Sequence, residues 1–252
     1  MSTSITGPVS PGDSPLGERH ASLAEHDAFV EAVTAECRIP GSQQALRRAL
    51  GKPVNDVPAR THAVLLRGGV LPDTARGEAR RAHYAVAALI ANRPRAALLD
   101  APWPGPPTDP DGREETSSAL QPAAGTFHPS GTSLGESLAK AAILRSPDLV
   151  ARDAPGEATK VTGLEARIHL MSRQDTDGLH RMLPGVLRLV DSAGTVPVDY
   201  ACLLKDLLAW RWRRDSVATR WLTDYYRTIN RERAAAKARN QPSRQSGPAR
   251  PS

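Results

Sequence analysis

The chain has 252 residues, of which 40% are hydrophobic, so it is long enough to bury one large or two small cores. Lys and Arg number 33 against 27 Asp and Glu, and this net charge of +6 favours acidic partners, nucleic acid first and anionic membranes second. The longest apolar stretch, around residues 85–90, is far too short to cross a bilayer, and no secretory pattern opens the chain, so we expect a soluble, cytoplasmic protein without a membrane partner.

The first half of the chain predicts helices. Residues 1–20 are rich in Ser, Pro and Gly, which predicts a disordered N-terminus. Ser22 and Glu25 form a capping box, so a helix is expected to begin there and to end before Pro40. Further helices are expected at residues 42–50, around 64–66 and at 74–92. These elements form an N-terminal helical group, residues 21–100.

Residues 101–131 carry Pro and Gly runs without periodicity, which is typical of a linker. Two more capping boxes follow, Ser133 with Glu136 and Thr162 with Glu165, and each predicts the start of a helix. A C-terminal helical bundle is therefore expected over residues 132–229.

The last three helices of that bundle have the clearest patterns. The helix from Asp177 has an apolar stripe and contains Pro184, which either kinks it or restricts its first turns. A leucine-rich helix from Tyr200 is expected to close at Trp210, and residues 211–214 to bridge into a final helix. The basic tail, residues 230–252, is predicted to be disordered. No alternating strand pattern competes, so the predicted fold is all-α, with two helical groups joined by a Pro/Gly-rich linker.

Catalytic and metal-binding patterns are weak. Gly131, Ser133 and Gly135 match the nucleophile-elbow motif, but no strand pattern precedes the serine, so a helix cap is the better interpretation. The His residues lack metal spacing, and Cys37 and Cys202 lie in apolar helical patterns that predict buried free thiols. We therefore predict no enzyme activity, no catalytic residue, no metal site and no cofactor.

The basic residues carry the functional prediction. Arg181 and Arg188 are seven residues apart and so share the polar face of one helix, although such arginines often only solvate a helix. Arginines recur on several helices, and phosphate binding needs several guanidinium groups. The candidate nucleic-acid-binding residues are Arg47, Arg48, Arg167, Arg173, Arg181, Arg188, Arg211, Arg213 and Arg214.

Two tryptophans next to this basic cluster have two possible roles. Trp210 and Trp212 suit either base stacking or core packing. The leucine stripe favours a core position for Trp210 and leaves Trp212 open.

The order and spacing of several segments resemble the CasB family, the small subunit of the type I-E CRISPR surveillance complex Cascade. The resemblance covers roughly residues 22–228. The segments that carry it are QALRRAL at 44–50, YAVAALIA at 84–91, SLGESLA at 133–139, RIHLMSR at 167–173, LHRMLPGVLRL at 179–189, VDY at 198–200, LLKDLLAW at 203–210 and RW at 220–221.

The resemblance implies an all-helical, non-catalytic protein that is present in two copies in Cascade and contacts the CasA, CasC and CasE subunits. It also implies a basic surface that steadies the crRNA with the target DNA strand and holds the displaced non-target strand of the R-loop in antiviral defence. The resemblance places the family's basic positions on Arg47 or Arg48, Arg167, Arg173 and the cluster at residues 211–214. One further basic position of the family is occupied here by the Pro-Gly pair at 184–185, and Arg181 or Arg188 would take over its role.

Two other functions fit a basic helical chain. A free-standing DNA-binding regulator would bind one operator, although no recognition helix stands out in the sequence. A pure assembly scaffold would tolerate the loss of its arginines.

Overall fold

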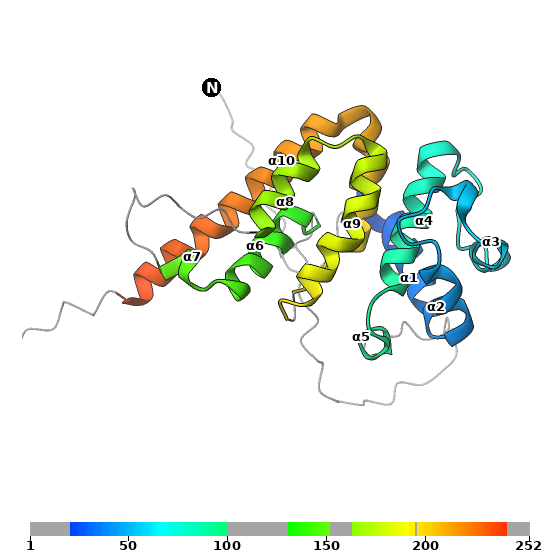
Figure 1. The fold of residues 1–252 in the computed structure, drawn as a ribbon, viewed down its shortest axis with the longest axis horizontal. Helices are drawn as coiled ribbons and strands as arrows, with labels where there is room; N and C mark the ends of the chain where they lie inside the picture. Colours follow the sequence, from blue (N-terminus) through cyan, green and yellow to red (C-terminus); the bar gives the residue numbers. More distant parts are fainter. Residues whose placement is uncertain (1–20, 100–130, 152–162, 195, 241–252) are drawn as a thin grey trace, which may run out of the picture.

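The computed structural model describes residues 21–99, 131–151, 163–194 and 196–240. Twelve helical elements occur in these ranges, and Figure 1 shows their arrangement. They are the 3-10 turns η1 (Ala21–Leu23) and η2 (Val54–Asp56) and the helices α1 (Ala24–Cys37), α2 (Pro40–Arg47), α3 (Ala59–Arg67), α4 (Gly77–Ala91), α5 (Arg95–Leu99), α6 (Leu134–Arg145), α7 (Asp148–Ala151), α8 (Gly163–Ser172), α9 (Thr176–Asp191) and α10 (Tyr200–Asn240).

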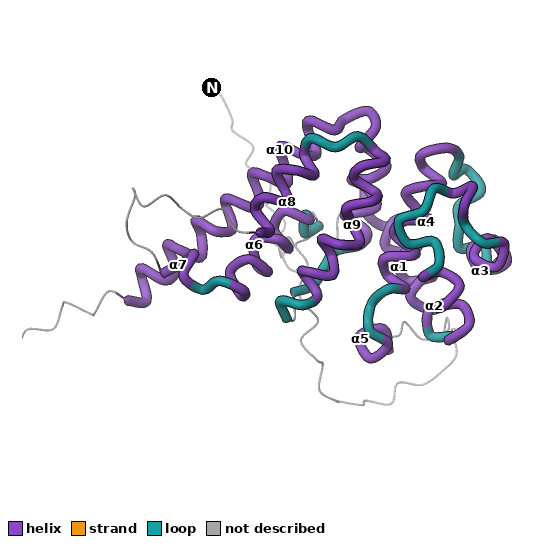
Figure 2. Tube along the Cα trace, in the orientation of Figure 1, coloured by secondary structure: helices purple, strands orange, loops and turns teal. Residues whose placement is uncertain are grey.

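The all-α prediction is confirmed, because none of the described residues forms a strand (Figure 2). The expected linker lies outside the described residues except for Gly131, and so does the N-terminal segment 1–20. The helix expected at 74–92 begins later, at Gly77, whose φ of +49° follows the extended Arg76.

One predicted cap is confirmed and one is wrong. The Ser133 hydroxyl accepts a hydrogen bond of 3.3 Å from the Glu136 amide at the start of α6, so this serine is a helix cap. Ser22 does not cap α1, which starts after the η1 turn without a side-chain cap. The Ser22 hydroxyl instead accepts a hydrogen bond of 3.2 Å from Lys205 Nζ of α10. The third expected cap, Thr162, lies outside the described residues.

The long α10 is two helices that fold back on each other. Arg213 has non-helical backbone angles, φ −134° and ψ 30°, where the two halves join. Trp221 Nε1 donates a hydrogen bond of 2.6 Å to Asp206, although fifteen residues of straight helix would separate the two by about 22 Å. The bridge predicted at residues 211–214 is therefore confirmed as a sharp bend.

Buried aromatic rings hold this hairpin closed. Trp210 and Trp221 stack with their ring centroids 5.2 Å apart, and both are almost completely buried. Asp206 is 1% exposed and accepts hydrogen bonds from Arg220 and Trp221. Burial raises the pKa of the Asp206 carboxyl, and the adjacent Arg220 guanidinium opposes that change.

The core is continuous across both halves of the described chain. Helix α10 packs against α1 and α4 of the first half and against α6, α7 and α8 of the second (Figure 1). Its N-terminus is anchored by Asp199, whose carboxylate accepts hydrogen bonds of 2.9 Å from the backbone amides of Thr132 and Cys202. The expected helical groups thus share one core cluster.

The C-terminal helix is longer than expected. The tail predicted from residue 230 is helical as far as Asn240, and residues 241–252 lie outside the described part. Two features account for the extension. The segment is rich in Ala and Arg, which are strong helix formers, and Arg233 Nε donates a hydrogen bond of 2.7 Å to the Leu149 carbonyl of α7.

Candidate nucleic-acid interface

Three of the predicted arginines meet between α8 and α9. Arg167 of α8 and Arg181 and Arg188 of α9 line an open depression of about 460 Å³. The rest of its lining is apolar, with Met182, Gly185, Val186 and Leu189. The apolar stripe of α9 faces the core, so its polar face carries both arginines outward.

A second, smaller depression of about 270 Å³ shares Arg167 and Leu189 with the first and adds Arg145 from the end of α6. We call the two together the arginine groove and define it by Arg145, Arg167, Arg181 and Arg188. Arg145 was not predicted from the sequence, because a single arginine in the last turn of a helix is common and only the packing of α6 places it here. Its guanidinium donates a hydrogen bond of 2.9 Å to the Ser192 hydroxyl at the end of α9.

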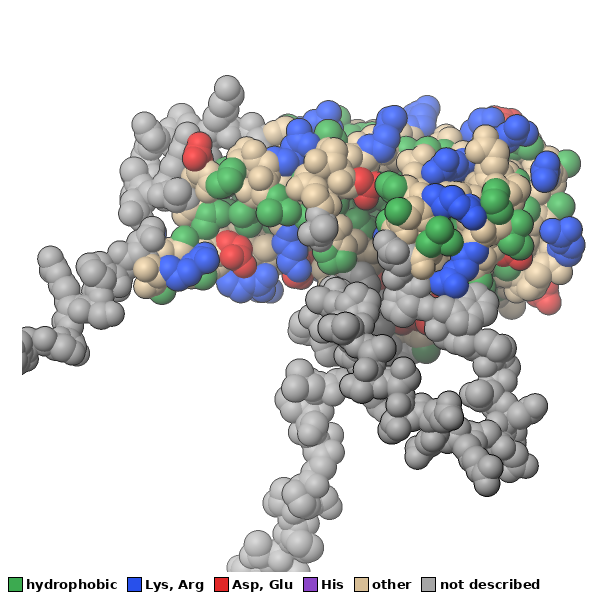
Figure 3. Space-filling model, turned by 90° about the horizontal axis from the view of Figure 1, so that it is seen from below, with side chains coloured by type: hydrophobic (Ala, Val, Ile, Leu, Met, Phe, Trp, Pro, Cys, Tyr) green, Lys and Arg blue, Asp and Glu red, His purple; other side chains and the backbone are tan. Residues whose placement is uncertain are grey.

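Carboxylates do not line the arginine groove within the described part of the chain. Asp177, one turn before Arg181, is held by Arg81 of α4, which also lowers the pKa of the Asp177 carboxyl. The groove therefore concentrates positive charge, with no carboxylate in its lining, on a surface built by three helices. Figure 3 shows one face of the molecule, on which Lys and Arg side chains recur with acidic side chains between them.

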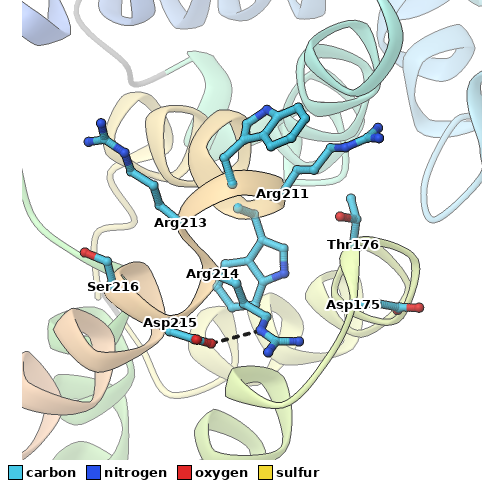
Figure 4. Close-up of a pocket in the computed structure, with 9 residues that line it drawn as sticks. Asp175, Thr176, Arg211, Arg213, Arg214, Asp215 and Ser216 are labelled. Atoms are coloured by element: carbon cyan, nitrogen blue, oxygen red, sulfur yellow. Dashed lines mark hydrogen bonds and ion pairs between the residues drawn. The ribbon is translucent and has the colours of Figure 1, made fainter.

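The arginines at the α10 bend do not converge. In Figure 4 the side chains of Arg211, Arg213 and Arg214 point in different directions from the bend. Arg211 lies 4.0 Å from Glu78 of α4, and Arg214 Nε lies 3.1 Å from Asp215. Part of the charge predicted for this cluster is thus compensated by carboxylates.

Arg173 lies next to the bend rather than in the groove. It is exposed and follows the last residue of α8 directly. The neighbouring Gln174 carbonyl accepts a hydrogen bond of 3.3 Å from Trp210 Nε1, which places this segment against α10.

Arg47 and Arg48 are adjacent in sequence but differ in their surroundings. Arg47 Nε donates a hydrogen bond of 2.7 Å to the Ala91 carbonyl, and Nη2 donates one of 3.0 Å to the Arg93 carbonyl. It therefore closes the C-terminus of α4, which satisfies carbonyls that have no partner within the helix. Arg48 is exposed and has no hydrogen bond or ion pair among the described residues.

The two tryptophans differ in how far they are buried. Trp210 is 1% exposed and belongs to the core, as the leucine stripe predicted. Trp212 is 79% exposed, and the Arg211 guanidinium carbon lies 5.0 Å from its ring centroid. It is the most exposed of the large hydrophobic side chains in the described residues.

Both cysteines lie in the buried core. Burial raises the pKa of Cys37 and of Cys202 to about 12, so both thiols stay protonated near neutral pH. Both are free and buried, as the sequence predicted. Within the described ranges no group of three or more His, Cys, Asp or Glu side chains is arranged to hold a metal ion, and no helix is long and apolar enough to cross a membrane.

Comparisons with known proteins agree with this architecture. No curated protein gives a significant match. Two solved structures, titled "CRISPR RNA-guided surveillance complex" and "CRISPR RNA-guided surveillance complex, pre-nicking", contain chains that are each 29% identical to this one, with TM-scores of 0.56 and 0.57. The matches cover 85% of this chain and 98% and 99% of those chains.

A third solved structure, the crystal structure of M. ruber CasB, shares the fold at 20% identity, with a TM-score of 0.56 over 85% of this chain and 99% of that chain. The model of the family described as CRISPR-associated protein Cse2 matches residues 44–226, which include α3, α4, both depressions of the arginine groove and the α10 bend. The chain therefore belongs to the CRISPR-associated Cse2 family.

Proposed function

We propose that this chain is the non-catalytic small subunit of a type I-E CRISPR surveillance complex, where it binds crRNA and the target and displaced DNA strands and thereby stabilises the R-loop. The family membership and the likeness to chains of surveillance complexes support this role. The partners in the proposal are the CasA, CasC and CasE subunits and a second copy of the chain.

The observation that carries the proposal is the arginine groove. Guanidinium groups bind phosphate oxygens in paired geometry whatever the base sequence. Arg167, Arg181 and Arg188 come from two helices packed on one core, so their positions are held together before any ligand binds. A surface of this kind binds nucleic acid without sequence specificity, because phosphate contacts carry no base information.

Weak contacts are sufficient for this role. The heteroduplex formed in an R-loop is about as stable as the DNA duplex that it replaces, so small backbone contributions decide the balance. An exposed ion pair contributes roughly 0.2–1 kcal/mol. The four arginines of the groove together are therefore enough to shift the balance towards the open R-loop.

The test replaces Arg181 and Arg188 with alanine and measures the binding of a short duplex to the full-length protein across a range of salt concentrations. Each phosphate contact contributes about 0.9 to the slope of log K against log salt. The double variant should bind more weakly at low salt, and its slope should be shallower by about 1.8 if both arginines contact phosphate. In the assembled complex the same variant should shorten the lifetime of the R-loop.

The chain offers a matched control. Arg60 and Arg67 are also seven residues apart on one helix, α3, and are also exposed, but α3 does not line the arginine groove. Replacing this pair with alanine removes the same charge and should leave the slope within error of the wild type. If both pairs reduce the slope equally, net charge alone accounts for binding and the groove has no special role.

Two other functions remain as outcomes of the same experiment. Unchanged R-loop lifetime with both arginine pairs removed would favour a pure assembly scaffold, in which the exposed Leu144 and Leu170 are candidates for protein contacts. Tight binding to one DNA sequence, insensitive to Arg181 and Arg188, would favour a free-standing regulator.

The arginines at the bend form a second arm of the test. Replacing Arg211, Arg213 and Arg214 together should weaken R-loop stability less than the loss of the groove pair, because Glu78 and Asp215 already compensate two of these charges. If the triple variant lowered R-loop stability more than the Arg181 and Arg188 double variant, the main phosphate contacts would lie at the bend and not in the groove.

A further inference from the structure

Trp212 occupies an unusual position for a tryptophan. Its neighbour Trp210 is 1% exposed, whereas Trp212 is 79% exposed, although the two are only two residues apart at the same bend. Exposing an indole to water loses the free energy that its burial would contribute, roughly 1.5–3 kcal/mol for a large apolar side chain. Trp212 does not pack in the core, so its indole is accessible to a ligand.

Arg211 covers one face of the Trp212 ring. The Arg211 guanidinium lies 5.0 Å from the ring centroid, within the range of a cation–π contact, and Arg211 is drawn towards Glu78 of α4 at 4.0 Å. A ring that is covered on one face and is still 79% exposed has its other face open to solvent. This arrangement orients the indole and leaves one flat apolar face free.

The bend also forms a depression next to the ring. The cavity of about 390 Å³ is lined by the two tryptophans Trp210 and Trp212, by Thr176 and Ser216, and by Arg211, Arg213 and Arg214. Figure 4 shows the labelled lining residues around the bend, with Asp175 and Asp215 among them. Three arginines and two aspartates thus line the cavity; Asp215 is paired with Arg214, and the Asp175 carboxylate caps α9 by accepting a hydrogen bond from the Gly178 amide. The bend therefore places the exposed indole beside positive charge, which suits a nucleotide whose base stacks on the ring.

We propose that Trp212 stacks on an unpaired nucleobase, so that the α10 bend is a separate binding site for single-stranded nucleic acid beside the arginine groove. This inference rests on the proposed function, since the groove supplies the phosphate contacts that bring a strand to the bend. A flipped or single-stranded base offers a π face to the indole, while the bases of an intact duplex are already stacked on one another. The site adds a preference for single strands that phosphate contacts alone do not provide.

The test separates bases from phosphates. Binding of the full-length protein is measured at one salt concentration with a single strand, the same strand annealed as a duplex, and a single strand of equal length made of abasic units. The wild type should bind the base-containing single strand about 5- to 150-fold more tightly than the abasic strand, which is the effect of stacking one base. Trp212→Leu keeps an apolar, helix-compatible side chain without a π face and should bind the two single strands equally.

Two variants serve as controls. Trp212→Tyr keeps an aromatic face and should restore most of the preference for the base-containing strand. The groove pair Arg181→Ala with Arg188→Ala should weaken binding to both single strands by the same factor, because both carry the same phosphates. Duplex binding should not change in Trp212→Leu, and neither should its thermal stability, because the side chain is exposed.

The outcomes are distinguishable. Failure of the wild type to bind any of the three oligonucleotides would remove the proposed function itself. Wild-type binding with equal affinity for base-containing and abasic strands, or a preference that survives in Trp212→Leu, would overturn the stacking site alone. A Trp212→Leu chain that binds oligonucleotides normally but no longer joins the assembled complex would make Trp212 a protein contact and would also overturn it.

Discussion

Gly135 of α6 lies directly against the backbone of α10 at Trp221, and replacing it with alanine tests how closely the two helices pack. A Cβ atom built on Gly135 would lie 1.9 Å from the Trp221 carbonyl oxygen and 2.7 Å from the Trp221 carbonyl carbon. Contacts of a real Cβ essentially never fall below 3.0 Å, so the helices would have to separate by about 1 Å. The obstructing atoms are backbone and belong to a completely buried residue, so they cannot turn aside.

The cost follows from this geometry. Overpacking a closely packed core costs about 1–3 kcal/mol, and a backbone obstruction belongs at the upper end. The intrinsic preference of helices for Ala over Gly offsets about 1 kcal/mol of it. The net loss is about 2 kcal/mol, which corresponds to a fall in Tm of about 4–8 °C for a chain of this length.

Calorimetry of the full-length Gly135→Ala variant measures this fall, and Gly185→Ala is the matched control. Gly185 lies inside α9, where an added Cβ would meet nothing within 4 Å, so the same substitution should raise the stability by about 0.5–1 kcal/mol. The reasoning would be refuted by a Gly135→Ala variant as stable as the wild type, or by equal effects of the two substitutions.

Three further outcomes follow from the geometry. Replacing Arg47 with alanine should cost about 0.5–1.5 kcal/mol of unfolding free energy, because the Ala91 and Arg93 carbonyls lose one donor each and keep only Gln43 Nε2, and it should leave the salt slope of nucleic-acid binding unchanged. Arg48→Ala should leave the stability unchanged and make the salt slope shallower; denaturant titration and binding assays on the two variants test this. Asp206→Ala should cost about 1–3 kcal/mol of unfolding free energy, because it leaves the buried Trp221 N–H without an acceptor. Asp206→Asn keeps one acceptor oxygen and should cost less, so equal losses of stability in thermal unfolding would contradict this prediction. Burial and the nearby Arg81 lower the pKa of His180 to about 4, so the unfolded chain binds the proton more tightly than the folded protein does. Stability that is present above pH 6.5 should therefore be lost as the pH falls towards 4, by at most about 3 kcal/mol. The difference between the stability curves of the wild type and His180→Asn across this pH range measures the loss, and parallel curves would contradict the prediction.

The predicted binding residues show where sequence reasoning reaches its limit. Arg181 and Arg188 could be placed on one face because their spacing is local to a single helix. Arg47 and Arg48 could not be separated, since the partner that turns Arg47 inward is the end of α4, more than forty residues away in the chain. Arg145 was missed for the same reason, because only the packing of α6 brings it to Arg167.

The sequence by itself determined the all-α class, the cap at Ser133 and the bend near residues 211–214, because periodicity, capping and breaks in a stripe depend on residues within a few turns of one another. Only the tertiary structure decided that α10 folds back so that Trp221 reaches Asp206, that three helices bring their arginines to one groove, and that Trp212 is left in solvent. These features depend on the packing of helices distant in sequence, where shape complementarity of whole side-chain layers sets the arrangement and no local pattern specifies it.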